Sequence, residues 1–230
     1  MNETPSGALR IAVFDVDRTL VRGTSAEVQL VRFLRRKRLF PSANLFRAVF
    51  WIPRLIPGGI KEAFLRNKFY LYGLDARFVR SLLPEFFERQ LKPLLSPKMV
   101  SSLNRFKSEG FTVLLISGTL DFVLDFLIQT LDADGGVGTH VEIRDGKFTG
   151  RVYGVYPFSR DKVTALVQVL DGRCVDWKAS YGFADSWADV RFLSLFGHPV
   201  AVNPDWVLRR KALRQGWVVE YDSPKQGFRR

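Results

Sequence analysis

Two acidic residues, Asp15 and Asp17, stand one residue apart directly after the short apolar run 11–14. The run is rich in branched and aromatic residues, which is typical of a strand buried on both faces of a parallel sheet. Two carboxylates at a strand end raise each other's pKa unless a cation lies between them. We therefore expect a site for a hard cation such as Mg²⁺, where one carboxylate acts as a nucleophile and the other transfers protons.

The same residues also allow a purely structural interpretation. Strand ends are often followed by an Asx-turn, in which acids only cap backbone amides. The Asp-x-Asp-x-Thr spacing, which Thr19 completes, is short enough to occur by chance. Other chemical groups must therefore converge on this strand end before it counts as a site.

Ser117 and Gly118 follow a second apolar run, 111–116, and precede a helical pattern from about Leu120 to Leu131. A hydroxyl and backbone amides at the start of a helix are suited to binding a phosphate. The alternative is an ordinary N-cap residue, which is common at helix starts.

Lys162 lies in the first turn of another expected helix, for which Ser159 is the expected N-cap. A cation is unfavourable near the positive end of the helix dipole, so a lysine there makes sense if it faces an anion. The alternative is an exposed lysine without a chemical role.

A second pair of acids follows the strand-like run 180–184. Asp185 ends that run, and Asp189 comes four residues later. A spacing of four lets both side chains face one point if a helical turn follows, as a metal site requires.

Four motifs, in chain order, resemble those of the haloacid dehalogenase-like (HAD) superfamily, in its phosphoserine-phosphatase-like branch. They are Asp15-Val-Asp17-Arg-Thr19, Ser117-Gly-Thr, Lys162 and Asp185-Ser-Trp-Ala-Asp189. The tail 197–205, together with Gly216 and Trp217, is similar to a group of hypothetical hydrolases in that branch. The resemblance therefore covers nearly the whole chain.

This resemblance implies a Mg²⁺-dependent phosphatase in which Asp15 takes the phosphoryl group. Asp17 would protonate the leaving oxygen and later activate water. The implied Mg²⁺ ligands are Asp15, Asp17 through its backbone carbonyl, Asp185, and Asp189 directly or through water. The implied phosphate-binding residues are Thr19, Ser117, Gly118 and Lys162.

Two positions depart from the family pattern, and one of them, Ala184 in place of glycine before Asp185, is a change between small residues that the fold should tolerate. Phosphoserine phosphatases place an acid shortly after the first motif to hold the substrate ammonium, whereas this chain has Thr24 there. Glu27 is the nearest acid. The departure at Thr24 bears directly on whether phosphoserine is the substrate.

Alternating strand and helix patterns predict an α/β fold, a Rossmann-like doubly wound and mostly parallel sheet with an inserted all-helical cap. We assign 1–20 and 109–230 to the core and 21–108 to the cap. Helical patterns in the cap cover 60–72, 76–90 and 97–108. A hairpin with Asp145 and Gly146 in its turn is expected to extend one edge of the sheet. The last helix is expected from Asn203-Pro204 to about Arg214.

The formal net charge of +12 resides in one segment. Residues 21–110 hold 18 Lys and Arg against 6 Asp and Glu, and the rest of the chain holds 17 of each. Such an insertion suits an anionic partner, which could be a phosphorylated substrate, a membrane surface or nucleic acid. The alternative is a solvated basic face.

Segment 39–57 is aromatic and apolar, but Arg47, Pro53, Arg54 and Pro57 interrupt it. A membrane span needs about 20 nearly continuous apolar residues, so we expect none. We favour a helix packed against its neighbours over one lying on an anionic membrane. Two kinds of substrate follow, a soluble phosphorylated small molecule or a lipid phosphate presented at such a membrane.

A non-enzymatic nucleic-acid-binding protein is the alternative from a different class. The sequence has no recognisable nucleic-acid module, so nucleic acid is not expected as a partner. Cys174 is the only cysteine, which excludes an intrachain disulfide, and the first residues lack a signal-peptide pattern. We expect a cytoplasmic protein, with peripheral contact to the inner membrane face as the variant of that prediction.

Overall fold

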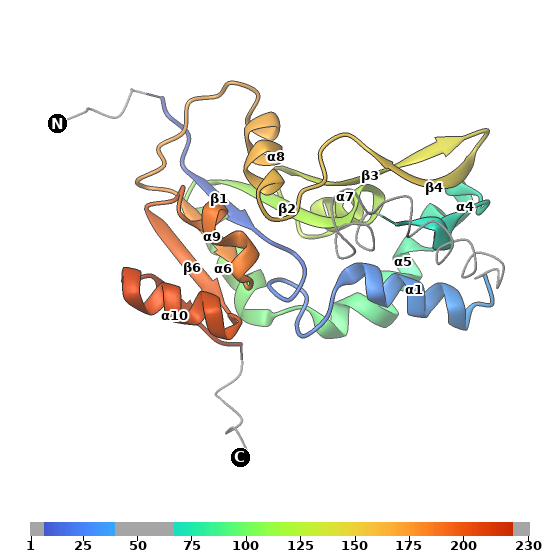
Figure 1. Cartoon of the computed structure of the whole chain (residues 1–230), viewed down its shortest axis with the longest axis horizontal. Helices are drawn as coiled ribbons and strands as arrows, with labels where there is room; N and C mark the ends of the chain where they lie inside the picture. Colours follow the sequence, from blue (N-terminus) through green and yellow to red (C-terminus); the bar gives the residue numbers. More distant parts are fainter. Residues whose placement is uncertain (1–6, 40–66, 223–230) are drawn as a thin grey trace, which may run out of the picture.

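The computed structural model describes residues 7–39 and 67–222, which form a seven-stranded sheet flanked by helices (Figure 1). The strand order is β4-β3-β2-β1-β5-β6-β7, and every neighbouring pair is parallel except β3 and β4. The strands are β1 (Ile11–Phe14), β2 (Thr112–Leu120), β3 (Gly135–Arg144), β4 (Lys147–Tyr153), β5 (Tyr181–Ala184), β6 (His198–Val202) and β7 (Val218–Glu220). The predicted α/β fold with a mostly parallel sheet is confirmed.

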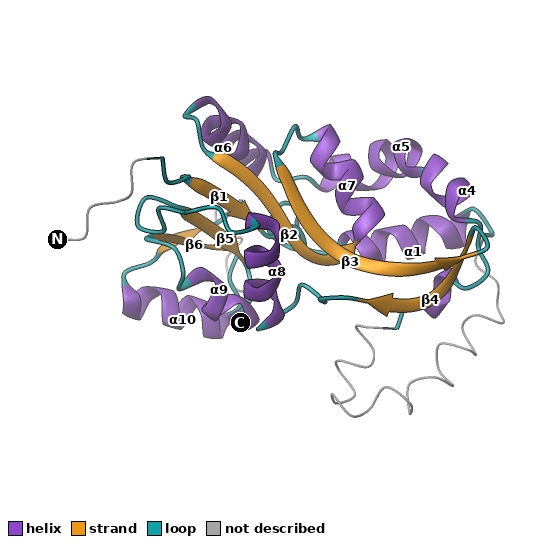
Figure 2. Ribbon diagram, turned by 90° about the horizontal axis from the view of Figure 1, so that it is seen from above, coloured by secondary structure: helices purple, strands orange, loops and turns teal. Residues whose placement is uncertain are grey.

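Helices cover both faces of the sheet. The α-helices are α1 (Ala26–Arg36), α4 (Ala76–Ser81), α5 (Leu83–Phe86), α6 (Pro97–Ser108), α7 (Asp121–Thr130), α8 (Asp161–Leu170), α9 (Val190–Leu193) and α10 (Trp206–Gln215). Short turns are the 3-10 segments η2 (Phe69–Leu71), η4 (Lys92–Leu94) and η5 (Trp187–Asp189) and the π-helical η3 (Phe87–Leu91). Helices α6 and α7 lie on one side of the sheet and α8, α9 and α10 on the other (Figure 2).

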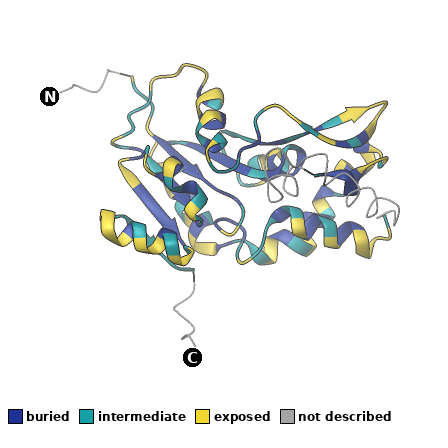
Figure 3. Cartoon of the chain, in the orientation of Figure 1, coloured by how far each residue is buried: buried dark blue, intermediate teal, exposed yellow. Residues whose placement is uncertain are grey.

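Strand β1 is buried on both faces, as the sequence predicts (Figure 3). Successive side chains of a strand point to opposite faces. Ala12 and Phe14 therefore pack with α1, α6 and α7, whereas Ile11 and Val13 pack with α8, α9 and α10. Asp15 continues the second set, which directs its side chain toward α8.

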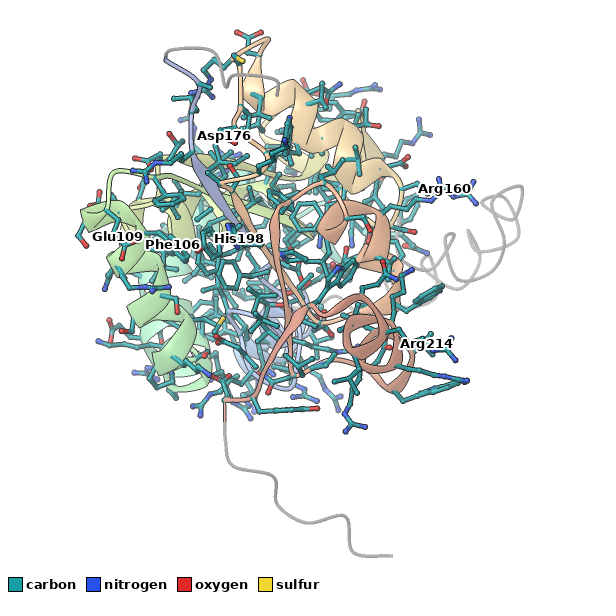
Figure 4. The ribbon with its side chains drawn as sticks, turned by 90° about the vertical axis from the view of Figure 1, so that its left-hand side faces the viewer. Phe106, Glu109, Arg160, Asp176, His198 and Arg214 are labelled. Atoms are coloured by element: carbon teal, nitrogen blue, oxygen red, sulfur yellow. The ribbon has the colours of Figure 1, made fainter. Side chains whose placement is uncertain are left out.

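Helix α6 packs directly on the sheet. The ring of Phe106 lies 6.3 Å from that of Phe14 and 5.7 Å from that of Phe183, measured between centroids. In the end view Phe106 lies on the sheet side of the helix, and Glu109 follows at its C-terminal end (Figure 4). The division into a core of 1–20 and 109–230 and a cap of 21–108 stays a prediction.

The hairpin of β3 and β4 has Asp145 and Gly146 in its turn, both with positive φ, as predicted. Its outer strand and turn are hydrogen-bonded through the backbone to residues 73–76, which precede and begin α4. The amide of Gly73 donates to the carbonyl of Phe148 over 2.8 Å, and that of Ala76 donates to Gly146 over 2.8 Å. The amide of Phe148 in turn donates to the carbonyl of Leu74 over 3.0 Å. Residues 73–76 are therefore hydrogen-bonded to the edge of the sheet.

Two of the predicted elements differ in the structure. The helix predicted over 76–90 is interrupted at Leu82, because Pro84 in the first turn of α5 has no amide to donate to the preceding turn. Strand β2 continues through Ser117 to Leu120 instead of ending at Ser117, with an irregular register against β3. Helix α7 therefore starts only at Asp121.

Two predicted helix starts are wrong. Ser159 has a φ of 56°, which is incompatible with the extended backbone of an N-cap, and α8 starts at Asp161. Helix α10 starts at Trp206 and is capped by Asp205, whose side chain accepts from the amide of Leu208. Both helices nevertheless occupy the predicted stretches of sequence.

No helix within the described ranges has the length and apolar composition needed to cross a bilayer. The aromatic segment 39–57, apart from Leu39, and most of the helical pattern 60–72 lie outside those ranges. The prediction of a packed or interfacial helix there stays a prediction.

Candidate active site

The predicted site residues gather where β2, β1 and β5 run side by side. Asp15 follows β1, Asp185 follows β5, and Ser117 lies in β2. The Asp15 amide donates to the carbonyl of Phe183 over 2.9 Å, which fixes the backbone of one acid against the neighbouring strand. The chain passes from β1 to β2 on one side and reaches β5 on the other, so this is a topological switch point, where α/β sheets bind ligands.

The carboxylates of Asp15, Asp185 and Asp189 form one cluster. Each contributes an oxygen, and these oxygens all lie within 4.8 Å of one another. All three residues are buried, with exposed fractions of 5%, 7% and 5%. The short η5 turn after β5 carries Asp189 back toward Asp185, which is how a spacing of four residues converges on one point.

Lys162 lies against this cluster. Its Nζ is 2.8 Å from Oδ1 of Asp15 and 2.8 Å from Oδ1 of Asp189. Burial lowers the pKa of Lys162, but the charges of Asp15 and Asp189 outweigh burial and raise it overall. The predicted lysine in the first turn of α8 therefore does face anions and stays charged.

Burial raises the pKa of Asp15 well above its usual value; Lys162 opposes the shift, and the other aspartates add to it. Burial, and then the charge of Asp189, raise the pKa of Asp185 to about 7. Three buried carboxylates carry more negative charge than one lysine can balance. Carboxylate oxygens are the ligands that Mg²⁺ prefers, so the donors of this cluster fit a divalent hard cation.

The side chain of Asp17 stands outside this cluster. Its Oδ1 accepts from the amide of Ala26 over 2.8 Å and from the hydroxyl of Thr119 over 3.4 Å. Burial is the largest cause that raises the pKa of Asp17 to about 6. A carboxyl group with this pKa both gives and takes protons near neutral pH.

The predicted phosphate-binding residues lie around the same point. Thr19 donates to Oδ2 of Asp15 over 3.4 Å, and the hydroxyl of Ser117 accepts from the amide of Thr119 over 3.1 Å. Gly118 lies beside Tyr156, since a β-carbon at residue 118 would come within 3.2 Å of the tyrosine oxygen. Because β2 continues through these residues, their amides do not belong to a helix start, and this part of the prediction is wrong.

A family model described as haloacid dehalogenase-like hydrolase matches residues 12–194. The chain belongs to this family. The predicted recognition is confirmed, and the match spans all four motifs on which it was based.

Relatives of this HAD hydrolase include several phosphatases. A histidinol-phosphatase from Neisseria meningitidis is 29% identical over 217 residues, covering 91% of this chain and 97% of the relative. The phosphoserine phosphatase SerB1 from Mycobacterium tuberculosis is 26% identical, covering 94% and 72%. The crystal structure of a protein of unknown function from Bordetella pertussis Tohama I has a TM-score of 0.78 and 27% identity, covering 94% and 100%. The prediction of an enzyme of the phosphatase type agrees with the family and with these relatives.

Four residues beside the site of this hydrolase did not follow from sequence reasoning as parts of one group. Lys68 and Tyr70 contact Glu27, and Tyr156 lies between Lys68 and Gly118. Lys68 precedes the 3-10 turn η2 and Tyr70 lies in it, whereas the sequence predicts a continuous helix over 60–72. The helical pattern therefore did not indicate which side chains face Glu27. The sequence indicated only Glu27, as the nearest acid after the first motif.

Proposed function

We propose that this HAD hydrolase is a phosphatase that cleaves phosphomonoesters through an aspartyl-phosphate on Asp15. A carboxylate oxygen of Asp15 attacks phosphorus, and the bond between phosphorus and the ester oxygen breaks. Asp17 gives its proton to the leaving oxygen. It then takes a proton from the water that attacks the aspartyl-phosphate, which frees inorganic phosphate and restores Asp15.

The chain's own residues supply most of the charge compensation that phosphoryl transfer needs. We assign Lys162, Ser117, Thr19 and the amide of Gly118 to the phosphate oxygens. Mg²⁺ would be held by Asp15, Asp185, Asp189 and the backbone carbonyl of Asp17, and when bound it supplies positive charge beside the phosphate. The like charges of the three carboxylates are the observation that supports this metal.

A single observation carries the proposal. Asp15 lies buried at a strand end, with Lys162 2.8 Å from one oxygen and the hydroxyl of Thr19 3.4 Å from the other. A carboxylate that only capped backbone amides would have neither partner. The groups around Asp15 are therefore those of an oriented nucleophile.

Hydrolysis of p-nitrophenyl phosphate with and without Mg²⁺ tests the proposal. We expect Asp15→Asn to lower kcat by at least about 1,000-fold, because an amide cannot accept the phosphoryl group. Asp145→Asn in the hairpin turn is the matched control, since Asn-Gly is favoured in such turns and activity should not change. Turnover by Asp15→Asn at the wild-type rate would refute Asp15 as the nucleophile. Full activity after metal chelation would refute the dependence on Mg²⁺.

The names of the relatives support a phosphorylated small molecule as the substrate. Four expectations stay predictions. They are a lipid phosphate as the alternative substrate, contact with an anionic membrane, the absence of nucleic acid as a partner, and the cytoplasmic location. The contacts of the described residues favour none of these. Flotation with anionic liposomes at low salt tests the membrane contact. If the protein does not bind the liposomes, the contact is excluded.

A further inference from the structure

Lys68 is a buried lysine that the proposed chemistry does not use. It is 1% exposed, and its Nζ donates to both carboxylate oxygens of Glu27, over 2.7 Å and 2.5 Å. The hydroxyl of Tyr70 donates to Oε1 of Glu27 over 2.9 Å. We call Glu27, Lys68 and Tyr70 the paired cluster. The side chain of Lys68 is 2% exposed and that of Glu27 is 22% exposed. Taking such a pair out of water does not by itself stabilise a fold, so we ask what the pair could bind.

The paired cluster adjoins the groups that would surround the substrate. Glu27 follows Ala26, whose amide donates to the carboxylate of Asp17. Because Asp17 would protonate the leaving oxygen, the leaving group must emerge on this side of the phosphate.

Tyr156 connects the paired cluster to the phosphate side. Nζ of Lys68 lies 5.9 Å from the centre of the Tyr156 ring. The oxygen of the same tyrosine would lie 3.2 Å from a β-carbon at residue 118. Tyr156 therefore lies between the cluster and Gly118, whose amide is assigned to the phosphate, while Ala26 joins the cluster to Asp17, which is assigned to the leaving oxygen.

The hydrogen-bonding capacity of the paired cluster limits what it can bind. A carboxylate accepts about four hydrogen bonds, and Glu27 already accepts three. An ammonium has three donors, and among the described residues Lys68 uses two, both on Glu27. One donor and one acceptor remain, on a pair whose charges cancel.

The charge of Glu27 is already balanced by Lys68, so it would attract a substrate ammonium only weakly. For the same reason Lys68 would attract a substrate carboxylate only weakly. A hydroxyl is neutral and both donates and accepts, so it matches what remains. Resting on the proposed phosphatase function, we propose that Glu27, Lys68 and Tyr70 bind the leaving group and select a neutral, hydroxyl-bearing alcohol over a zwitterionic amino acid. The occupied carboxylate gives a physical reason why Glu27 does not replace the acid that is missing at Thr24.

The test compares kcat/KM for glycerol 3-phosphate, O-phosphoserine and p-nitrophenyl phosphate with Mg²⁺. We expect the wild type to prefer glycerol 3-phosphate over O-phosphoserine by at least about tenfold, since a site that leaves polar groups unpaired rejects the wrong leaving group. Lys68→Met should reduce this preference to about one, and Tyr70→Phe should reduce it by about threefold to tenfold. Each preference is a ratio of kcat/KM values for two substrates, measured on one preparation of one variant. The fraction of active protein therefore cancels.

Lys92→Met is the matched control. Lys92 donates to both oxygens of Glu88 with the same two-point geometry, but that pair is exposed, so all three kcat/KM values should stay unchanged. Tyr70→Phe retains the ion pair and protects the test against a Lys68→Met variant that does not fold. Circular dichroism and Tm measurements identify such a variant.

The outcomes separate this inference from the proposed function. If the wild type does not hydrolyse p-nitrophenyl phosphate, the proposed function itself fails. If it does, equal or better hydrolysis of O-phosphoserine overturns the inference alone. Failure to hydrolyse glycerol 3-phosphate, or an unchanged preference in both Lys68→Met and Tyr70→Phe, overturns it equally.

Discussion

The ammonium of Lys162 donates to Oδ1 of Asp15 over 2.8 Å, although the two residues are 147 positions apart in the chain. The contact joins the first turn of α8 to the end of β1. It places a fixed positive charge beside the proposed nucleophile, and it leaves the other oxygen of Asp15 with Thr19.

Replacing Lys162 should affect stability as well as turnover. In Lys162→Met, Asp15 and Asp189 lose their ion-pair partner while both stay buried, so the free energy of unfolding of the metal-free protein should fall by about 3–5 kcal/mol. Adding Asp185→Asn should recover part of this loss by removing one like charge. Denaturant unfolding measures both effects, and the exposed Lys178→Met is the control. Equal stability of Lys162→Met and the wild type would contradict the prediction.

Asp17→Asn should slow both proposed proton transfers while the Asn oxygen still accepts from the amide of Ala26. We expect kcat to fall by about 100-fold to 10,000-fold. With p-nitrophenyl phosphate, whose leaving group needs little help from an acid, the first step should survive better than the second. Stopped-flow measurements should therefore show a burst of about one nitrophenolate per chain. Slow turnover without a burst would argue against Asp17 as the base in the second step.

Without Mg²⁺, the protein should lose stability as the pH rises from about 4 to 7. The folded state raises the pKa of Asp17 to about 6 and that of Asp185 to about 7, above the ordinary aspartate value of 3.8. The folded state then binds more protons than the unfolded chain in this range, so the free energy of unfolding falls with increasing pH. Asp185 alone should account for at most about 3–4 kcal/mol of this fall in the free energy of unfolding.

Asp185→Asn isolates this contribution. At pH 7 the metal-free variant should have a higher Tm than the wild type, and at pH 4 the two should agree. Mg²⁺ should raise the Tm of the wild type more than that of the variant. Scanning calorimetry of both proteins at the two pH values, with and without Mg²⁺, measures these Tm differences. A lower Tm for Asp185→Asn at pH 7 would show that the carboxylate stabilises the metal-free fold.

Gly118→Ala should weaken substrate binding without disturbing the fold. The φ of Gly118 is not in the left-handed region, so only space matters, and the new methyl would lie 3.2 Å from the oxygen of Tyr156. We expect KM to rise by about threefold to tenfold through a small shift of Tyr156. Tyr156→Phe in the same chain should reverse part of the rise. An unchanged KM in the single variant would mean that the tyrosine moves aside freely.

The sequence was sufficient for the parts of the fold that depend on local pattern. Apolar strands ending in Asp15 and Asp185 placed the acids at one edge, because parallel strands end together. The prediction of Ser159 as an N-cap is wrong, because a left-handed backbone at that residue depends on how the preceding loop reaches α8. The pairing of Lys68 with Glu27 could not be predicted either, since it joins residues 41 positions apart through tertiary packing.

The backbone bonds from Gly73 and Ala76 to the hairpin have an evolutionary consequence. They pair residues 73–76 with the hairpin in a fixed register, so a change in hairpin length would shift one segment against the other. A graft of this insertion onto a related enzyme should fold only if the hairpin is transferred with it. The two segments are separate in sequence, but we expect them to change together, because each keeps its register only with the other.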